Sequence, residues 1–374
     1  MRREHLEALR PLCPRCRAEG REHPLALAAV HEEQGEHVVQ GLLACSGEGC
    51  WQEYPILDGV PLIVADVRGF VSGQAASILL RQDLHPALAG LVGDACGPGS
   101  HYDVVRQHLS NYAWDHYASF DPEERPEGEG AGAEPPGSVV RVLERGLALA
   151  GEAALGPVLD AGCAVGRVSF ELAARRPGEL VLGVDLNYPM LRLAARALRE
   201  GVVRYQRRRV GLVYDPRQAP LPYAPEARAR VDFWALDASA LPFAAGSFAL
   251  ATSLNLLDCL ADPLGHLSSL VHTLRPGGRA LLATPHDWSA SATAVEAWVG
   301  GHSQRGPTEG ASEPLLRALL TPGQHPAAVA GLEIVAEDPD VPWQVRLHAR
   351  SRARYRAQLL ALARAETNAR GTSP

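Results

Sequence analysis

The sequence predicts an α/β protein built on a mostly parallel sheet, because apolar strand-like runs alternate with helical runs from about residue 156 onward. Three of these runs end in an acidic residue, namely Asp160, Asp185 and Asp237. A glycine-rich turn over residues 162–166 directly follows the first run and leads into an amphipathic stretch at 168–173. A strand, a glycine turn and a helix in this order bring the backbone N–H groups of a helix N-terminus toward a ligand.

Five apolar runs account for the core strands of the expected sheet. They lie at residues 156–160, 180–185, 231–237, 248–253 and 280–284. Two later runs, at 331–335 and 341–347, bring the expected number of strands to seven. The long segment 201–230 has room for an inserted hairpin, with apolar stretches at 202–205 and 210–214.

The acids at the strand ends suit a cofactor that carries a ribose. Asp185 lies about 20 residues beyond the glycine turn, where a carboxylate can accept hydrogen bonds from ribose hydroxyls. Gly162 and Gly166 let the backbone approach a ligand closely because they carry no Cβ. The competing interpretation is a glycine turn that only joins a strand to a helix.

The order Asp-x-Gly-x-x-x-Gly at 160–166 resembles motif I of class I methyltransferases, which use S-adenosylmethionine (SAM). The later strand-end acids and the Arg-Pro-Gly-Gly step at 275–278 extend the likeness. The resemblance implies a Rossmann-like fold whose last two strands are antiparallel, with SAM as the cofactor. It implies cofactor contacts at Asp160, Gly162, Cys163, Gly166, Asp185, Leu186, Asp237, Ala238 and Asn255.

Four of the seven cysteines cluster near the N-terminus, as Cys13-x-x-Cys16 and Cys45-x4-Cys50. Two close pairs about 30 residues apart match the ligand pattern of a structural zinc ribbon, in which four thiolates hold one Zn²⁺. Disulfides are the weaker interpretation because we expect the chain in the cytoplasm. Ordinary buried thiols are the remaining alternative.

The segment Tyr-Pro-Ile-Leu-Asp-Gly-Val-Pro at 54–61 strengthens the ribbon assignment. Together with the cysteine pairs it resembles a small zinc-ribbon family that acts, in eukaryotes, as an activating partner subunit of tRNA and release-factor methyltransferases. The second cysteine pair departs from that family, with four intervening residues where two are usual. We expect a zinc-ribbon domain at 1–66, with Asp58-Gly59 as a turn.

Residues 67–137 are expected to form a helical connector and a flexible loop, and residues 138–374 the SAM-dependent methyltransferase domain. The connector contains an aromatic-rich stretch at 110–117, which either closes over a ligand or packs at a domain junction. Residues 121–138 are rich in Pro, Glu and Gly, as in a flexible surface loop. A helical pattern resumes at 139–150.

The composition is that of a globular protein, with 46% hydrophobic and 21% charged residues among 374. A formal charge of −7 disfavours a broadly basic surface for nucleic acid. No apolar stretch reaches the roughly 18–20 residues of a membrane span, and the N-terminus lacks the apolar region of a secretory signal. We therefore expect a cytoplasmic protein with no membrane partner. The arginines expected on the solvated side of a C-terminal strand and helix are Arg346, Arg350, Arg352, Arg354 and Arg356.

Segments near the predicted strand ends bear on the methyl acceptor. Thr-Pro-His-Asp-Trp at 284–288 and Glu-Ala-Trp-Val-Gly-Gly at 296–301 resemble, with the glycine turn, the methyltransferase domain of ovothiol biosynthesis, which methylates a mercaptohistidine imidazole. The resemblance implies a small imidazole or amino-acid-like acceptor that is methylated on nitrogen. Asn255, His286 and Asp287 are the candidates for catalysis, because ligands bind at the carboxyl ends of such strands.

Other side chains and other functions remain open. Asp258 is a further polar candidate, and Trp288 and Trp298 are candidate walls of the acceptor cavity, with packing as the alternative role for each. The chain is a small-molecule N-methyltransferase, an RNA or protein methyltransferase whose ribbon holds a macromolecule, or a non-catalytic protein that keeps the fold. The negative charge favours the first function, and the intact strand-end acids disfavour the third. The sequence indicates no particular partner protein.

Overall fold

The computed structural model describes residues 1–124 and 135–365. The chain forms two compact units, each assembled from several segments of the chain. Unit 1 consists of Met1–Arg141, Gly162–Asp237 and Pro342–Tyr355, and unit 2 consists of Val142–Ala161, Ala238–Val341 and the described residues from Arg356 onward. The three segments expected from the sequence (1–66, 67–137 and 138–374) remain a prediction.

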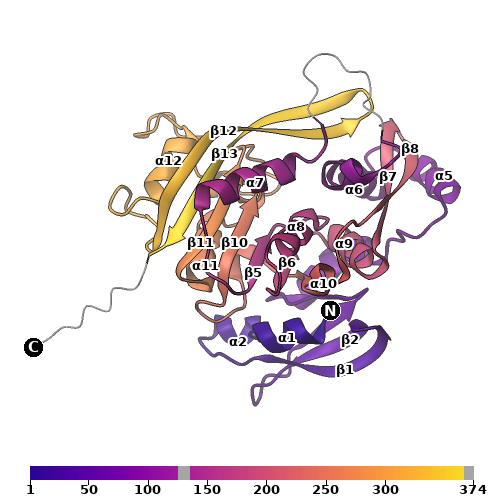
Figure 1. Cartoon of the computed structure of the whole chain (residues 1–374), viewed down its shortest axis with the longest axis horizontal. Helices are drawn as coiled ribbons and strands as arrows, with labels where there is room; N and C mark the ends of the chain where they lie inside the picture. The colour runs from indigo at the N-terminus through magenta and orange to yellow at the C-terminus, as the bar shows by residue number, and fades with distance from the viewer. Residues whose placement is uncertain (125–134, 366–374) are drawn as a thin grey trace, which may run out of the picture. The chain divides into compact units, whose positions relative to one another are not determined.

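The first part of unit 1 is a four-stranded antiparallel sheet with two short helices (Figure 1). The predicted turn at Asp58-Gly59 is confirmed, because both residues have positive φ (53° and 85°) and join the last two strands of this sheet. The elements are α1 (Arg3–Leu9), α2 (Pro14–Ala18), β1 (Leu25–Gln34), β2 (His37–Cys45), β3 (Glu53–Leu57) and β4 (Val60–Pro61).

The connector of unit 1 is helical, as predicted. Its main helix, α6, begins at Ser100, whose Oγ accepts a hydrogen bond from the backbone N–H of Asp103 (3.2 Å) and so satisfies one of the first free N–H groups of the helix. Residues 125–134 of the predicted flexible loop lie outside the described residues. The helices are α3 (Val67–Gly73), α4 (Ala75–Leu79), α5 (Pro86–Cys96), α6 (His101–Tyr117) and η1 (Ala118–Phe120).

The remainder of unit 1 contains two parallel strands, a hairpin and three helices. β6 (Val181–Asp185) pairs in parallel with β9 (Val231–Ala235), and Asp185 lies opposite Ala235. The predicted inserted hairpin is confirmed, but Gly211 and Leu212 form its turn instead of belonging to a strand. The other elements are α8 (Arg167–Arg175), α9 (Tyr188–Glu200), β7 (Val202–Val210), β8 (Val213–Pro220) and α10 (Pro225–Ala229).

The N-terminal sheet makes backbone and side-chain contacts within unit 1. The residue after β4, Leu62, forms a parallel bridge with Ala235 of β9, and Ile63 donates its N–H to the Ala235 carbonyl (3.0 Å). The Asp58 carboxylate accepts a hydrogen bond from Tyr188 Oη (2.8 Å) and forms an ion pair with Arg192 (2.8 Å) on α9. These contacts attach the N-terminal sheet to β9 and to the first turns of α9.

Unit 2 contains neighbouring strands in the order β12-β13-β11-β10-β5. β10 pairs in parallel with both β5 and β11, whereas β13 is antiparallel to β11. All seven residues of β10 are buried, as expected for a parallel strand covered on both faces. The elements are β5 (Val158–Ala161), η2 (Ala238–Ala240), β10 (Phe248–Leu254), η3 (Leu257–Cys259), α11 (Pro263–Thr273), β11 (Leu274–Thr284), η4 (Val295–Ala297) and α12 (Ser312–Leu319).

Helix α7 (Ser138–Ala150) and strands β12 (Leu332–His348) and β13 (Ser351–Arg364) have residues in both units. The strands of the chain are those of a Rossmann-like fold with a mainly parallel central sheet, as the sequence predicts. None of the described helices combines the length and the apolar character that crossing a membrane requires.

The C-terminal prediction is wrong in two respects. The runs at 331–335 and 341–347 are parts of one strand, β12, and the expected C-terminal helix is the strand β13. Residues 357–362 are buried on both faces of β13, which pairs with β11 and lies beside β12, so pairing overrides the helical propensity of this Ala/Leu-rich stretch. Arg346, expected in solvent, is 1% exposed and donates from Nη1 to the Arg208 carbonyl (2.9 Å).

Candidate cofactor, acceptor and metal sites

The glycine turn of unit 1 has a backbone that requires glycine. Gly162 and Gly166 have φ of 73° and 92°, and a Cβ on Gly166 would lie 2.6 Å from the Phe233 ring. Gly162 and Cys163 donate their N–H groups to the Val184 carbonyl (2.8 and 3.0 Å). The turn is therefore fixed against the end of β6, and the buried Cys163 side chain packs beneath it.

Asp185, at the end of β6, holds the same turn through its carboxylate. Its Oδ2 accepts a hydrogen bond from Ala164 N–H (2.9 Å) and its Oδ1 from Asn187 N–H (2.8 Å). Burial raises the pKa of the Asp185 carboxyl, and the backbone N–H groups oppose that effect. A carboxylate oxygen can accept more than one hydrogen bond, so both oxygens keep capacity for a ligand hydroxyl. Leu186, the next residue, is 36% exposed.

The end of α6 supports the glycine turn from the other side. Tyr117 Oη donates to the Val165 carbonyl (2.5 Å), and His116 Nδ1 accepts from the Arg167 N–H (3.2 Å). The Arg167 guanidinium donates to the His116 carbonyl (2.5 Å) and lies 3.8 Å from the Phe120 ring centroid. Burial, helped by the Arg167 charge, lowers the pKa of His116 to about 3, so its imidazole stays neutral and can accept this hydrogen bond. Two residues of the predicted aromatic-rich stretch thus contact the turn directly.

Two of the predicted cofactor residues lie at the division between the units. Asp237 is the last residue of its segment of unit 1, two positions beyond β9, and Ala238 is the first residue of its segment of unit 2. Within unit 2 the Ala238 carbonyl accepts a hydrogen bond from His266 Nδ1 (3.0 Å). His266 Nε2 therefore carries a lone pair, which accepts from Ser253 Oγ (2.9 Å). Sequence reasoning missed His266, because a single buried histidine on a helix carries no signal of this role.

Asp160 is buried within unit 2, with 2% of its surface exposed. Its Oδ1 accepts a hydrogen bond from Thr252 Oγ1 (2.8 Å), the residue opposite it on β10. The carboxylate near the end of β5 is thus fixed by the neighbouring strand.

Asn255 and His286 follow the neighbouring parallel strands β10 and β11 of unit 2. Asn255 donates its N–H to the Ala283 carbonyl (2.8 Å). Both residues have positive φ (53° and 55°), a strained backbone for residues other than glycine and one that is common at functional sites. Asn255 Oδ1 and His286 Nδ1 are buried and have no hydrogen-bond partner among the described residues. Buried polar atoms without hydrogen-bond partners are rare, so these two atoms indicate a place where a ligand donates hydrogen bonds.

A chain of side chains determines where His286 carries its proton. Gln358 Nε2 donates to Glu337 Oε1 (2.9 Å), and Arg317 holds that carboxylate with two nitrogens (2.6 and 2.8 Å). Gln358 therefore presents its Oε1 to His286 Nε2 (2.8 Å), which must be the donor. A neutral His286 then keeps its proton on Nε2 and an acceptor lone pair on Nδ1. Gln358 was missed because it lies in a stretch predicted to be helical.

Asp258 fixes the loop after β11. Its Oδ1 accepts from Thr284 Oγ1 (3.2 Å) and its Oδ2 from the Asp287 N–H (2.8 Å). Thr284 Oγ1 in turn accepts from the His286 N–H (3.0 Å). Burial raises the pKa of the Asp258 carboxyl. Asp287 itself is exposed, so the structure uses its backbone to hold the loop and leaves its carboxylate toward solvent.

Two tryptophans of unit 2 are stacked, with ring centroids 6.1 Å apart and an angle of 19° between the rings. Trp288 Nε1 donates to Ser312 Oγ (3.1 Å), and Trp298 Nε1 donates to the Thr293 carbonyl (2.8 Å). Trp288 is two residues from His286, so the pair provides a flat apolar surface on the loop that carries this histidine.

The four N-terminal cysteines converge in unit 1. The sulfur atoms of Cys13, Cys16, Cys45 and Cys50 all lie within 4.8 Å of one another, and none forms a disulfide. Cys13 precedes α2 and Cys16 lies within it, whereas Cys45 ends β2 and Cys50 follows a tight turn. The longer second spacing is thus accommodated by that turn.

The distances between the sulfurs suit a tetrahedral metal. A Zn–S bond of about 2.3 Å implies about 3.8 Å between two thiolate sulfurs in a tetrahedron. Cys13 and Cys50 are 3.9 Å apart, and Cys16 and Cys45 are 3.7 Å apart. Tyr54 Oη lies 3.2 Å from the Cys13 sulfur, and the Gly47 N–H donates to the Cys45 sulfur (3.3 Å). Such donors stabilise thiolates around a metal, so the donor set fits zinc.

Comparison with known proteins identifies the domain. Residues 159–282 match a protein family described as a methyltransferase domain, which spans from β5 to β11. No curated protein matches the chain. Among solved structures, a SAM-dependent methyltransferase from Methanosarcina mazei is 21% identical over 56% of this chain and 92% of that chain, with a TM-score of 0.37.

Two further solved structures are similar to parts of the chain. The cyclase SpnF is 16% identical over 74% of this chain and 96% of that chain, with a TM-score of 0.43. A phosphoethanolamine N-methyltransferase from Haemonchus contortus, in complex with SAM, is 17% identical over 70% of this chain and 44% of that chain, with a TM-score of 0.34.

Proposed function

We propose that the chain is a SAM-dependent methyltransferase, on the basis of the methyltransferase domain at residues 159–282, and that it methylates a nitrogen of a small imidazole or amino-acid-like metabolite. The observation that carries this proposal is the pair of buried acceptor atoms, Asn255 Oδ1 and His286 Nδ1, at the ends of neighbouring strands. Both atoms need a donor, and an acceptor molecule with an N–H group supplies one. The mercaptohistidine-type resemblance supports the same class of acceptor.

The residues of unit 1 fit the cofactor. The turn at Gly162 and Cys163 leaves backbone free of large side chains, and both Asp185 oxygens keep capacity for ribose hydroxyls. Leu186 is exposed beside that carboxylate and is assigned to the adenine ring. When bound, SAM supplies the electrophilic methyl group of its sulfonium. We also assign Asp160, Asp237, Ala238 and Asn255 to the cofactor, as the methyltransferase resemblance implies.

The residues of unit 2 provide orientation and a proton acceptor. Holding a nucleophile in line can contribute roughly 7–11 kcal/mol to a displacement. A neutral imidazole attacks with its lone-pair nitrogen, and the methylated product then releases the N–H proton of its other nitrogen. His286 Nδ1 has the lone pair to receive that proton, and Asn255 Oδ1 orients the N–H group. The stacked Trp288 and Trp298 offer a flat surface for the ring of the acceptor.

We also infer that Cys13, Cys16, Cys45 and Cys50 hold one structural Zn²⁺. Four thiolates complete a tetrahedral site, which leaves no coordination position for a substrate. The ribbon therefore contributes stability to unit 1, through its contacts with β9 and α9, in the manner of the activating partner family that it resembles.

A macromolecular acceptor is the second candidate. Trp51, next to Cys50 on the ribbon, is 90% exposed, and exposed aromatic rings stack on unpaired bases or fill pockets of a partner protein. The net charge of −7 and the compact polar pair at Asn255 and His286 favour the small acceptor instead.

The test is transfer of a labelled methyl group from SAM into separated small-molecule, RNA and protein fractions of a cell extract, followed by defined imidazoles. We expect label in the small-molecule fraction, and its loss in His286→Ala. The matched control is His302→Ala, which removes a half-buried histidine of the same unit that contacts Ser303. Label that enters only RNA or protein would overturn the small-acceptor proposal, and label that survives His286→Ala would remove the assigned proton acceptor.

A further inference from the structure

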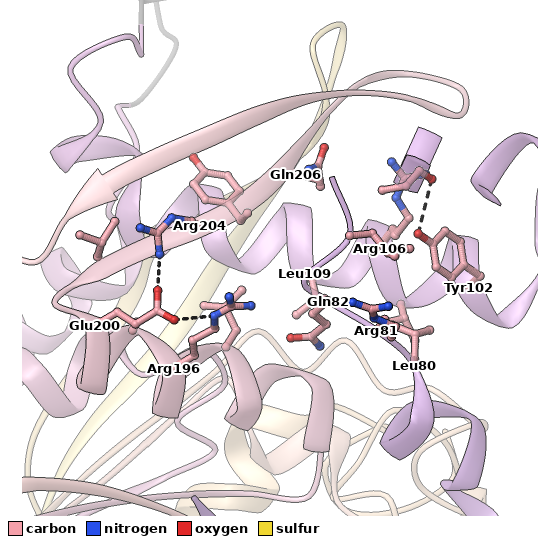
Figure 2. Close-up of a pocket in the computed structure, with 17 residues that line it drawn as sticks. Leu80, Arg81, Gln82, Tyr102, Arg106, Leu109, Arg196, Glu200, Arg204 and Gln206 are labelled. Atoms are coloured by element: carbon pink, nitrogen blue, oxygen red, sulfur yellow. Dashed lines mark hydrogen bonds and ion pairs between the residues drawn. The ribbon is translucent and has the colours of Figure 1, made fainter. Parts of the chain in front are cut away.

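Unit 1 contains a cleft that shares no residue with the glycine turn or with Asp185 (Figure 2). Its empty volume is about 760 Å³, which includes open solvent at the mouth. It lies between α6, the second half of α9, strand β7 and the segment before α5. Each helix contributes residues spaced three or four apart, which form one helical face.

One cation in the lining has no counter-ion. Arg106 is 7% exposed and makes no ion pair or hydrogen bond from its guanidinium among the described residues; its Nε and Nη1 are buried without partners. Its guanidinium carbon lies 3.9 Å from the centroid of the Tyr214 ring and 5.5 Å from that of Tyr102. Two aromatic faces attract the charge but do not satisfy its N–H groups. A buried, uncompensated arginine is costly unless an anion accompanies it.

The other cations of the lining are already paired. Arg81 forms a two-point ion pair with Asp83 (2.8 and 2.9 Å). Arg196 and Arg204 both bind the Glu200 carboxylate, as Figure 2 shows. Arg106 is thus the one cation of the lining that no carboxylate of the described residues contacts, so an anion would bind there.

The rest of the lining is suited to an apolar body. The apolar side chains of the lining are Leu80, Leu84, Ala89, Val105, Leu109, Leu193, Ala197 and Val202.

We propose that this cleft is a second ligand site that binds a small carboxylate with an apolar body, with the carboxylate at Arg106. Binding places an anion against the buried guanidinium and removes water from the apolar wall. The site belongs to unit 1 alone and operates whether or not the methyl acceptor proposed above is correct.

The test measures thermal stabilisation of the full chain by hexanoate and 4-phenylbutanoate, with hexanol as the uncharged control and inorganic phosphate as the alternative anion. We expect the carboxylates to raise the melting temperature in a concentration-dependent way, whereas hexanol and phosphate do not. Arg106→Met should weaken carboxylate binding about tenfold or more and leave SAM affinity unchanged, because a charge-assisted contact is lost. Arg106→Lys should retain part of the affinity.

The matched control is Arg356→Met, which removes an exposed arginine paired with Asp340 in unit 2 and should leave carboxylate binding as in the wild type. The melting temperature of Arg106→Met without ligand shows whether Arg106 serves a ligand site or stabilises the fold. Replacement of an unpaired buried charge by an apolar side chain should leave the melting temperature equal or higher. Absence of stabilisation by either carboxylate, stabilisation that survives Arg106→Met, or a response to phosphate alone would each overturn the proposal.

Discussion

Replacing Gln358 by leucine removes the acceptor that keeps the His286 proton on Nε2. Leucine has a similar size, so the change deletes one hydrogen bond to His286 (2.8 Å) and one to Glu337 (2.9 Å) without opening a large cavity. A buried donor left unsatisfied costs about 1–3 kcal/mol, which corresponds to a factor of about 5–150 in the tautomer ratio. Because only the Nε2–H tautomer has its lone pair on Nδ1, we expect kcat to fall by about that factor.

The assay is steady-state methyl transfer with the KM for SAM measured in parallel, together with the nitrogen chemical shifts of His286. We expect an unchanged KM for SAM, a lower kcat and a larger fraction of the Nδ1–H tautomer. His286→Ala should lower kcat further, by about 10²–10⁴. Gln324→Leu removes an exposed glutamine of the same unit and is the matched control. A wild-type kcat in Gln358→Leu, with the Nε2–H tautomer retained, would refute the role of this chain of hydrogen bonds.

Three further changes test the other sites. Asp185→Ala should weaken SAM binding by tenfold or more in calorimetry, because hydrogen bonds to a charged acceptor contribute about 1.5–3 kcal/mol each. Asp185→Asn should have an intermediate affinity. An unchanged affinity in Asp185→Ala would remove the ribose assignment. Metal analysis should find about one zinc per chain, and a chelator or Cys50→Ser should lower the melting temperature; a metal-free protein of equal stability would contradict the ribbon. The pKa of His116 is about 3 in the folded chain and 6.5 in the unfolded chain, so the unfolded chain binds more protons below pH 6.5. The free energy of unfolding should therefore fall from pH 6.5 toward pH 3, by up to about 1.4 kcal/mol per pH unit. His116→Asn keeps an acceptor for the Arg167 N–H and should flatten that slope in urea titrations, and equal slopes would count against a neutral buried His116.

The core strands could be predicted from the sequence because their apolar runs are short, continuous and bounded by glycine or acid. β6 and β10 begin and end within a residue or two of their expected limits, since burial on both faces leaves few other structures for such runs. The strand β13 could not be predicted in this way. Its residues 357–362 have the composition of a helix, and only pairing with β11, more than 70 residues earlier, makes them a strand.

Some residues of the candidate site could likewise be predicted from the sequence, and others could not. Asn255 and His286 could be predicted because the carboxyl ends of neighbouring parallel strands meet at one edge of a sheet. Gln358 and His266 could not, because they act through contacts with residues far away in the sequence and belong to no local motif. The expectation for Asp287 concerned its carboxylate, whereas the structure gives a role to its backbone N–H.

The bridge between Leu62 and Ala235 joins two parts of one polypeptide. If the N-terminal sheet were a separate chain, it would dissociate on dilution, and its occupancy would depend on how much of each chain the cell makes. Here the covalent link keeps the sheet near β9 at a local concentration that dilution does not change, on the order of millimolar for short linkers. The ratio of this sheet to the rest of the chain is fixed at one to one by translation itself.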